Sequence, residues 1–210
     1  MIIYNMVTRK DAIQQFKAIE RMIKDNNMRL AAQWSEDWKA LIATIMSAVT
    51  RDEVTIVVCE RLFRKYPSMK ALGRAKLGDV EKIIRPVNFY RNKSRNVIAT
   101  AKILSGKKIP DSVSELIKLP GVGRKVANVY LAEIHKASAI GVDTHVARIS
   151  YKLGWTNSKN PHVIEKDLER LFPRSYWVKI NETLVRFGKS YGTSRRREDD
   201  ILRGIMGAFR

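Results

Sequence analysis

The chain has 210 residues, of which 45% are apolar, so its length allows one medium domain or two small lobes with a buried core. Forty Lys and Arg residues against 21 Asp and Glu leave a formal net charge of +19, which indicates a polyanionic partner such as nucleic acid or an anionic membrane surface. The sequence has no apolar run long enough to cross a bilayer and no signal peptide, which argues against a membrane-spanning protein and predicts an intracellular, cytoplasmic one.

Apolar residues recur with helical spacing over residues 13–23, 41–49 and 54–62. The third stripe contains the only cysteine, Cys59, which we expect to pack on a buried helix face and to remain reduced inside a cell. The β-branched residues at 54–58 are the one serious strand candidate. Their charged flanks favour a helix.

Several helix boundaries can also be predicted. Ser112 with Glu115 three residues later fits a capping box, and Asn160 before Pro161 fits an N-cap followed by proline at the first helical position. With no internal repeat and no low-complexity linker, the sequence predicts an all-α protein of about ten helices. Left-handed C-terminal caps are expected at three glycines: Gly106, Gly154 and Gly188.

The stretch LPGVGRK, residues 119–125, interrupts the helical pattern between a helix ending near Lys118 and one starting near Arg124. Glycines allow positive φ and the close approach of another backbone, and the helix N-terminus beyond presents unpaired N–H groups and a positive dipole end. Such a turn can hold a phosphate, although the same glycines also suit an ordinary helical hairpin. The net charge and the lysine that follows favour phosphate binding, with these expected contacts: Leu119, Pro120, Gly121, Val122, Gly123 and Arg124.

LPGVGRK and the later VDTHVAR, residues 142–148, resemble the hairpin and the aspartate segment of the helix-hairpin-helix DNA glycosylases, most closely those of the endonuclease III family. Weaker matches are MSAVTRD and NFYRNKSRNV. The resemblance implies an all-α, two-lobed helix-hairpin-helix glycosylase fold with a central cleft. Residues 28–136 would form a six-helix barrel-like lobe that includes the hairpin. Residues 1–27 plus 137–210 would form a second helical lobe that carries the catalytic aspartate.

The resemblance also implies a chemistry. Lys125, as a neutral amine, would attack the anomeric carbon of a damaged nucleotide and form a Schiff base, and Asp143 would stabilise the positive charge that develops on the sugar. The pKa of this lysine must then be lowered, to which a helix N-terminus and Arg124 would contribute. From the residues alone, Lys125 could instead be a phosphate contact and Asp143 an N-cap for the helix that starts near Thr144.

We therefore expect a base excision repair glycosylase that removes oxidised or otherwise damaged pyrimidines from duplex DNA and cuts abasic sites by β-elimination. The alternatives are a uracil or thymine mismatch glycosylase without lyase activity, and a DNA-binding protein without catalysis. Adenine excision is not expected, because Thr44 stands where that branch of the family carries a glutamate. The expected partner is double-stranded DNA with damaged bases or abasic sites, with no membrane involved, and the protein is expected to be a monomer.

Side chains that fill the space left by an extruded base are expected from two segments. Phe89 is the candidate wedge, with a core aromatic at a helix end as the alternative. Asn88 stands where the family usually has a glycine, which is tolerable because Asn also adopts left-handed backbone. Val49 or Thr50 stands at the plug position, where the family usually has a glutamine. His145 could instead be a hydrogen-bonded structural residue. The C-terminal arginines could instead form a solvated charge run that contacts no DNA. The remaining expected DNA contacts are Tyr90, Arg91, Lys93, His145, Arg195 and Arg196.

The C-terminus departs from the family. Endonuclease III usually ends in a loop of four cysteines that holds a [4Fe–4S] cluster, whereas this chain has one cysteine, and Gly192 falls near the place of the first ligand. We therefore expect no iron–sulfur cluster, no other cofactor and no metal site. A short helix should hold this end of the chain through its apolar residues: Ile201, Ile205, Met206 and Phe209.

Overall fold

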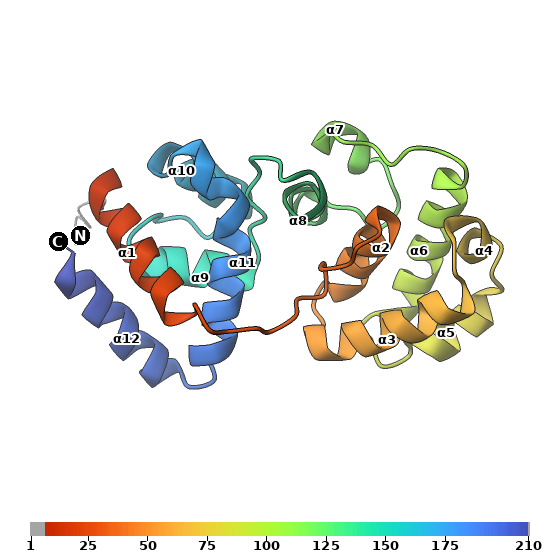
Figure 1. The fold of residues 1–210 in the computed structure, drawn as a ribbon, viewed down its shortest axis with the longest axis horizontal. Coiled ribbons are helices and arrows are strands. Elements are labelled where there is room, and N and C mark those ends of the chain that lie inside the picture. Colours follow the sequence, from red (N-terminus) through yellow and green to blue (C-terminus); the bar gives the residue numbers. More distant parts are fainter. Residues whose placement is uncertain (1–6, 210) are drawn as a thin grey trace. The chain divides into compact units, whose positions relative to one another are not determined.

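The structure is a computed structural model that describes residues 7–209, and within that range it contains twelve α-helices and no β-strand (Figure 1). The all-α prediction is confirmed, with more helices than the ten expected. The chain divides into two compact units, one being Arg29–Ala137 and the other Met1–Met28 with Ser138–Arg210. Residues 1–6 and residue 210, which the sequence assigned to the second lobe, lie outside the described part of the chain. Every helix within 7–209 is too short or too polar to cross a membrane.

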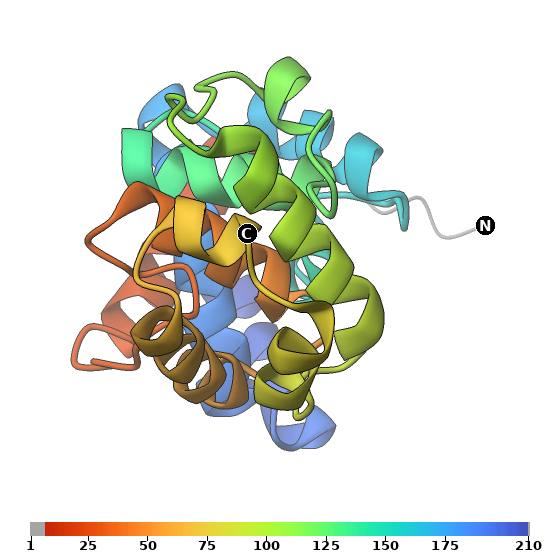
Figure 2. The same ribbon diagram turned by 90° about the vertical axis from the view of Figure 1, so that its right-hand side faces the viewer.

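The unit Arg29–Ala137 is built around α2, which contacts α3, α6 and α8. Helices α4 and α5 both contact α6, and Figures 1 and 2 show these elements side by side. The unit has seven helices, one more than the six expected. In chain order they are α2 (Asp37–Ser47), α3 (Asp52–Lys65), α4 (Met69–Gly73), α5 (Leu77–Ile84), α6 (Tyr90–Leu104), α7 (Val113–Leu116) and α8 (Arg124–His135).

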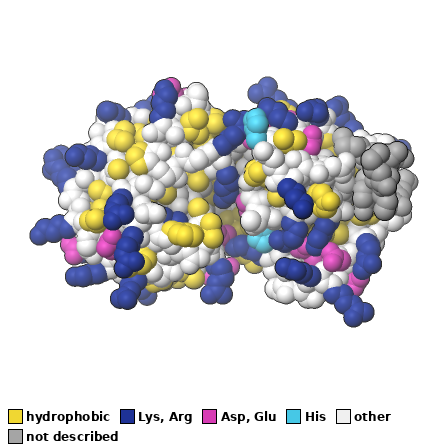
Figure 3. Space-filling model, turned by 180° about the vertical axis from the view of Figure 1, so that it is seen from behind, with side chains coloured by type: hydrophobic (Ala, Val, Ile, Leu, Met, Phe, Trp, Pro, Cys, Tyr) yellow, Lys and Arg dark blue, Asp and Glu magenta, His cyan; other side chains and the backbone are white. Residues whose placement is uncertain are grey.

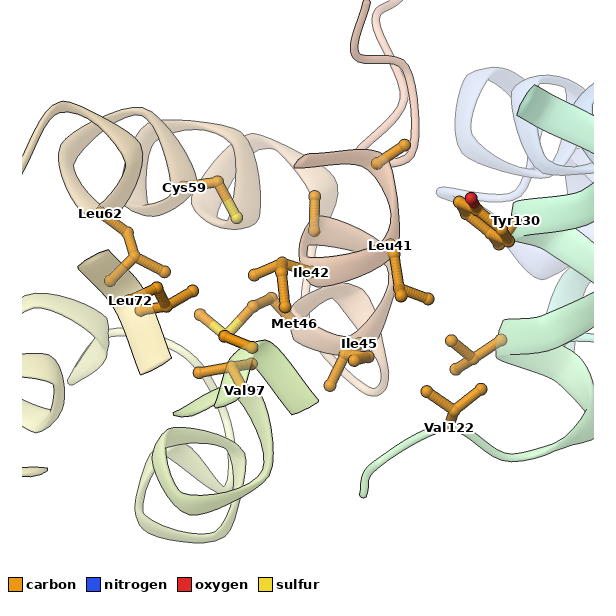
Figure 4. Packing of buried hydrophobic residues seen from close by; sticks show 14 of the residues in the cluster. Leu41, Ile42, Ile45, Met46, Cys59, Leu62, Leu72, Val97, Val122 and Tyr130 are labelled. Carbon is orange, nitrogen blue, oxygen red and sulfur yellow. The ribbon is translucent and has the colours of Figure 1, made fainter. Parts of the chain in front are cut away.

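Helix α2 lies in the core of this unit because its sequence is almost continuously apolar. Ile42, Met46 and their apolar neighbours on α2 are fully buried and lie together with Cys59 of α3 and Val97 of α6 (Figure 4). Burial raises the pKa of the Cys59 thiol to about 12, so the thiol stays protonated. The prediction that Cys59 occupies a buried helix face is confirmed.

The second unit has an aromatic core. The ring of Phe16 lies 5.8 Å from that of Phe172 and 5.6 Å from that of Tyr176. Trp155 is buried beside them, and its indole Nε1 donates a 2.7 Å hydrogen bond to Oε1 of the buried Gln15, which satisfies both polar groups. The helices described in this unit are α1 (Arg9–Met22), α9 (Thr144–Lys152), α10 (Pro161–Leu171), α11 (Arg174–Tyr191) and α12 (Arg195–Ala208).

The predicted helix caps are mostly confirmed. Ser112 and Asn160 cap α7 and α10 through their side chains, and Gly106 and Gly154 both have φ of +73° beyond a helix end. The prediction for Gly188 is wrong, because this residue lies inside α11. A Cβ atom there would lie 2.2 Å from Nδ1 of His145, so the glycine makes room for a side chain of α9.

The C-terminal helix was expected to be short, but α12 has 14 residues. It is held on α11 and α1 through the buried side chains of Leu202 and Ile205. Ile201 and Met206 are only partly buried, and Phe209 follows the last helical residue.

Candidate functional site

The hairpin between α7 and α8 is fixed to the core on both sides of its turn. Leu119 and Val122 are buried, and the Val122 N–H donates a 3.1 Å hydrogen bond to the carbonyl of Leu119. The hydroxyl of Thr100 on α6 donates a 2.8 Å bond to the carbonyl of Pro120. Because both of these apolar side chains are buried, the turn presents mainly its backbone and the ring of Pro120 to the surface.

The two hairpin glycines differ in what the fold requires of them. Gly121 has φ of +79°, and a Cβ atom there would lie 2.9 Å from Cβ of Asn96, so both conformation and space demand glycine. Gly123 has φ of −85°, and among the described residues no heavy atom lies within 4 Å of a Cβ built on it. Internal packing therefore explains Gly121, whereas Gly123 keeps the start of α8 open toward solvent.

Gly123 is the N-cap of α8, and the first residues of that helix are Arg124 and Lys125. The first N–H groups of any α-helix lack intrahelical acceptors and carry the positive end of its dipole. Two basic residues at this end repel the dipole, and the first turn of α8 contains no acidic residue to offset them. The half-buried Lys125 thus stands in a locally positive site that suits an anion.

Asp143 lies in the other unit, at the start of α9. It is half-buried, and its Oδ1 accepts a 2.9 Å hydrogen bond from the N–H of Val146, so the N-cap interpretation is confirmed. This cap uses one of its two carboxylate oxygens. The bond fixes the orientation of the carboxylate and is compatible with a second role for Oδ2.

His145 follows two residues later and is held from the side of α9. Its Nδ1 lies 3.2 Å from Nη2 of Arg148, which in turn donates hydrogen bonds of 2.9 and 2.8 Å from Nε and Nη2 to the carboxylate of Glu198 on α12. Burial lowers the pKa of His145, although the charge of Asp143 opposes that shift. These contacts support a neutral, structurally fixed imidazole.

The two segments expected to fill the gap in a duplex expose apolar side chains. Val49 is 73% exposed and Phe89 is 67% exposed, so the alternative of a core aromatic at Phe89 is wrong. Their φ angles are +56° and +58°, in the left-handed region where β-branched and bulky residues are rare. Such backbone costs about 1–3 kcal/mol per residue and persists only where surrounding contacts hold it.

Asn88 was expected to adopt the left-handed conformation, but the positive φ falls on Phe89 instead. The reason is that Asn88 holds the neighbouring segment. Its Nδ2 donates a 2.5 Å hydrogen bond to the carbonyl of Val49, and its backbone N–H donates a 3.2 Å bond to Oγ1 of Thr50. The loop that contains Val49 and Thr50 is therefore hydrogen-bonded directly to the loop that contains Asn88 and Phe89.

Lys93 does not lie at the surface as a phosphate contact would. It is 6% exposed, and its ammonium group donates to the carbonyls of Met46 and Ala48 and to Oγ1 of Thr50. The sequence contained a signal for this burial, because Lys93 stands four residues before Val97 on the same face of α6. Lys93 thus belongs to the buried stripe of that helix.

The remaining candidates have varied surroundings. Tyr90 is half-buried with the exposed Arg91 guanidinium 5.0 Å from its ring centre, and Arg195 and Arg196 are exposed in the first turn of α12. Thr44 is fully buried, and its hydroxyl donates a hydrogen bond to the carbonyl of Ala40.

On the face of the molecule shown in Figure 3, Lys and Arg side chains are spread widely and outnumber acidic ones.

The residues present do not fit an iron–sulfur cluster. Such a cluster needs four thiolates, whereas the chain has one cysteine, and that cysteine is buried as a thiol in α3. In the described part of the chain, no group of three or more His, Cys, Asp or Glu side chains is placed to hold a metal ion.

Comparison with known proteins identifies the family. Residues 42–174, more than half of the chain, match the model of the HhH-GPD superfamily base excision DNA repair proteins. Endonuclease III of Thermotoga maritima is 40% identical over 158 residues, which cover 74% of each chain. Endonuclease III of Synechocystis sp. is 33% identical over 196 residues, which cover 90% of each.

A similar fold occurs in a solved complex. The structure of a trapped endonuclease III–DNA covalent intermediate matches with a TM-score of 0.83 and 31% identity, over 90% of both chains. The chain therefore belongs to the HhH-GPD superfamily of base excision DNA repair proteins and is an endonuclease III-like DNA glycosylase.

Proposed function

We propose that this glycosylase removes oxidised and other damaged pyrimidines from duplex DNA and then cuts the abasic strand through a Schiff base on Lys125. The observation that carries the proposal is the start of α8, where an open Gly123 and two basic residues meet a helix N-terminus. An anion site with an amine in the same helical turn suits a nucleotide, which presents a phosphate and a sugar close together. The similarity to a protein trapped covalently on DNA supports the same assignment.

The proposed reaction has four steps. The neutral Lys125 amine attacks C1′ of the sugar, and the base leaves with the bonding electrons and takes up a proton. The bond between C1′ and O4′ then breaks, O4′ takes up a proton, and the protonated Schiff base that results makes the hydrogens on C2′ acidic. Loss of one C2′ proton expels the 3′ phosphate and cuts the strand. Water then hydrolyses the imine and frees the lysine.

We assign to Asp143 the stabilisation of positive charge on that sugar as the bond to the base breaks. The N-cap bond to Val146 supports this role because it holds the carboxylate in one orientation before the substrate binds. Its second oxygen can then accept and return a proton.

DNA is proposed to be gripped and opened by different parts of the molecule. The backbone of residues 119–124 would bind one phosphate, and Arg195 and Arg196 would contact others. Val49 and Phe89, with Thr50, Tyr90 and Arg91 next to them, would occupy the space of the extruded nucleotide. The exposure of the two apolar side chains supports this proposal, because Val49 and Phe89 are the most exposed of the large hydrophobic residues at the surface of the described chain.

The same proposal covers the setting of the enzyme. We infer that it works inside the cell, as a monomer, and without an iron–sulfur cluster or other cofactor. The single buried cysteine supports the last point, and the side chains of α12 provide an apolar and ionic attachment for the C-terminal end.

Borohydride trapping on a duplex with one abasic site tests the mechanism. The protein should form a covalent adduct, and Lys125→Ala should form none, since no other amine is proposed to attack C1′. Lys118→Ala is the matched control, because it removes one exposed lysine seven residues earlier and should trap like the parent. Failure of the parent to trap, or trapping by Lys125→Ala, contradicts the lyase proposal.

A panel of duplexes extends the test to the substrate. An oxidised pyrimidine such as thymine glycol should be removed with spontaneous strand cutting. Strand breaks that appear only after alkali, on uracil or a thymine mismatch, indicate the base-only alternative. Binding without any release of base indicates a non-catalytic DNA-binding protein.

A further inference from the structure

The ammonium group of Lys93 caps the C-terminal end of α2. Its Nζ lies 2.7 Å from the carbonyl oxygen of Met46, 2.5 Å from that of Ala48 and 3.1 Å from Oγ1 of Thr50. An ammonium group has three N–H donors, so these three acceptors use all of them.

The capped end of α2 needs such a partner. Helix α2 ends at Ser47, and it has no basic residue of its own in its last turn. The final carbonyls of a helix lack intrahelical donors and carry the negative end of its dipole. Lys93 supplies both the donors and the positive charge from a different helix.

The same residue also fixes the segment that carries Phe89. The backbone N–H of Lys93 donates a 3.0 Å hydrogen bond to the carbonyl of Phe89, which is the first bond of α6. Asn88 adds its two bonds to Val49 and Thr50. Lys93 therefore lies one helical turn after Phe89. Its ammonium group also bonds to Ala48 and Thr50, the two residues on either side of Val49.

The two apolar residues that Lys93 and Asn88 hold have strained backbone. Val49 and Phe89 both have positive φ and both expose most of their side chains. Of the non-glycine residues in the described range, only one other has positive φ, Lys136 at the end of α8. Backbone of this kind stays in place only when neighbouring bonds determine it, and the bonds here converge on Lys93 and Asn88.

We propose that Lys93 is a positioning residue that holds Val49 and Phe89 at the spacing needed to enter an opened duplex together. The inference rests on the proposed function, because it assumes that these two side chains meet DNA. Lys93 itself touches neither base nor phosphate in this scheme. Burial lowers its pKa to about 8, so the ammonium form that donates all three bonds predominates at neutral pH.

The test compares two substrates that differ in their need for a wedge. An abasic site in a duplex has an opposite strand that must be held open, whereas an abasic site in a single strand has none. Lys93→Met leaves an unbranched side chain that is one atom shorter and suits a buried position, but it removes the three donors. Borohydride trapping on the duplex should slow by about tenfold, and trapping on the single strand by less than about twofold.

Fluorescence gives a second readout that folding alone does not change. A 2-aminopurine placed opposite a non-cleavable abasic analogue should change its emission when the parent protein binds. At saturating protein, Lys93→Met should produce a clearly smaller change in emission, because the loops that carry Val49 and Phe89 enter the duplex less completely.

Two further variants complete the design. Val97→Ala removes buried volume one turn along the same face of α6 and touches neither loop, so it should lower the melting temperature while the duplex to single-strand ratio stays that of the parent. Asn88→Ala removes the bond to Val49 without touching a buried charge, and should shift the ratio in the same direction as Lys93→Met by a smaller factor.

The outcomes separate the two proposals. If the parent protein traps neither substrate, the proposed lyase function is wrong. If the parent traps both, but Lys93→Met lowers both rates equally or leaves the ratio and the fluorescence unchanged, the positioning role is wrong. If Lys93→Met does not fold, an unchanged ratio in Asn88→Ala overturns it.

Discussion

Gly121 and Gly123 are two residues apart, yet different forces select them. The fold requires glycine at position 121. Its φ is +79°, and a Cβ atom there would lie 2.9 Å from Cβ of Asn96. Gly123 has an ordinary φ and open space around it, so the fold would accept alanine there. What alanine would change is the surface that an approaching phosphate meets.

Alanine substitutions should therefore separate stability from binding. Gly121→Ala should lower the free energy of unfolding by about 1–3 kcal/mol, because it combines backbone strain with a steric clash. Gly123→Ala should change that free energy by less than about 0.5 kcal/mol. It should nevertheless weaken binding to all duplexes alike, because the lost contact is to phosphate and not to a base.

Chemical denaturation and fluorescence anisotropy with several undamaged and damaged duplexes measure both effects. A loss of affinity confined to one lesion in Gly123→Ala would mean that the hairpin reads bases. Equal destabilisation by both substitutions would mean that Gly123, too, is required by the fold.

Residue-scale prediction from the sequence succeeds where the cause is local. Ser112 and Asn160 cap helices because of hydrogen bonds to residues two or three positions away, which a sequence pattern contains. Gly188 was misassigned because its cause is a histidine 43 positions earlier (188 − 145) that packs against it. The positive φ of Phe89 was missed for the same kind of reason, because Asn88 forms hydrogen bonds with Val49 and Thr50, almost forty residues away in the sequence.

At the scale of helices, α12 shows how the C-terminal end is attached. Glu198 is 1% exposed and receives hydrogen bonds from Arg148 and Lys152 on α9, the helix that Asp143 caps. Burial would raise the pKa of Glu198, but these two partners outweigh it, and the pKa lies below its usual value of 4.5. An ion pair thus joins α12 to the helix of a proposed catalytic residue.

Glu198→Gln should destabilise the protein at neutral pH by about 2 kcal/mol, because two cationic groups lose a buried partner. Since the pKa of Glu198 is lowered in the folded state, its contribution is fully present above about pH 4.5. That contribution is lost as the pH falls through the lowered pKa. The difference between parent and variant should therefore shrink in acid, as measured by denaturation at a series of pH values.

Asp200→Asn is the matched control on the same helix. Its carboxylate pairs with Arg203 at 2.6 Å, but both side chains are exposed, so the change should cost less than about 1 kcal/mol. A difference for Glu198→Gln that stays constant from neutral pH to strong acid would show that the ion pair does not stabilise α12.

Helix prediction from the sequence was limited by length. Helices α4 and α7 have five and four residues, too few for an apolar period to be recognised, and they account for helices beyond the ten expected. Long elements such as α2 and α3 were predictable because their apolar stripes extend over several turns. The candidate site followed mainly from motif resemblance, whereas the buried cap formed by Lys93 required the structure.

At the scale of the whole molecule, the charge of +19 is far larger than the number of phosphates that one binding site contacts. Basic residues are spread over the surface seen in Figure 3, so most of them set the long-range field and not specific contacts. Arg195 and Arg196 begin α12, where positive charge opposes the helix dipole, as do Arg124 and Lys125 at the start of α8. Their charge therefore does not stabilise α12, and the proposed phosphate contacts of these two exposed arginines can be tested directly.

Salt dependence of binding distinguishes these classes of basic residue. The logarithm of affinity falls with the logarithm of salt concentration by about 0.9 for each phosphate contact. Replacing Arg195 and Arg196 by Gln should therefore reduce the magnitude of the slope on an undamaged duplex by about 2. The control is Lys107→Gln with Lys108→Gln, which makes the same change in net charge at an exposed turn after α6 and should leave the slope nearly unchanged. Equal slopes for both double variants would mean that only net charge matters and that the two arginines of α12 contact no phosphate.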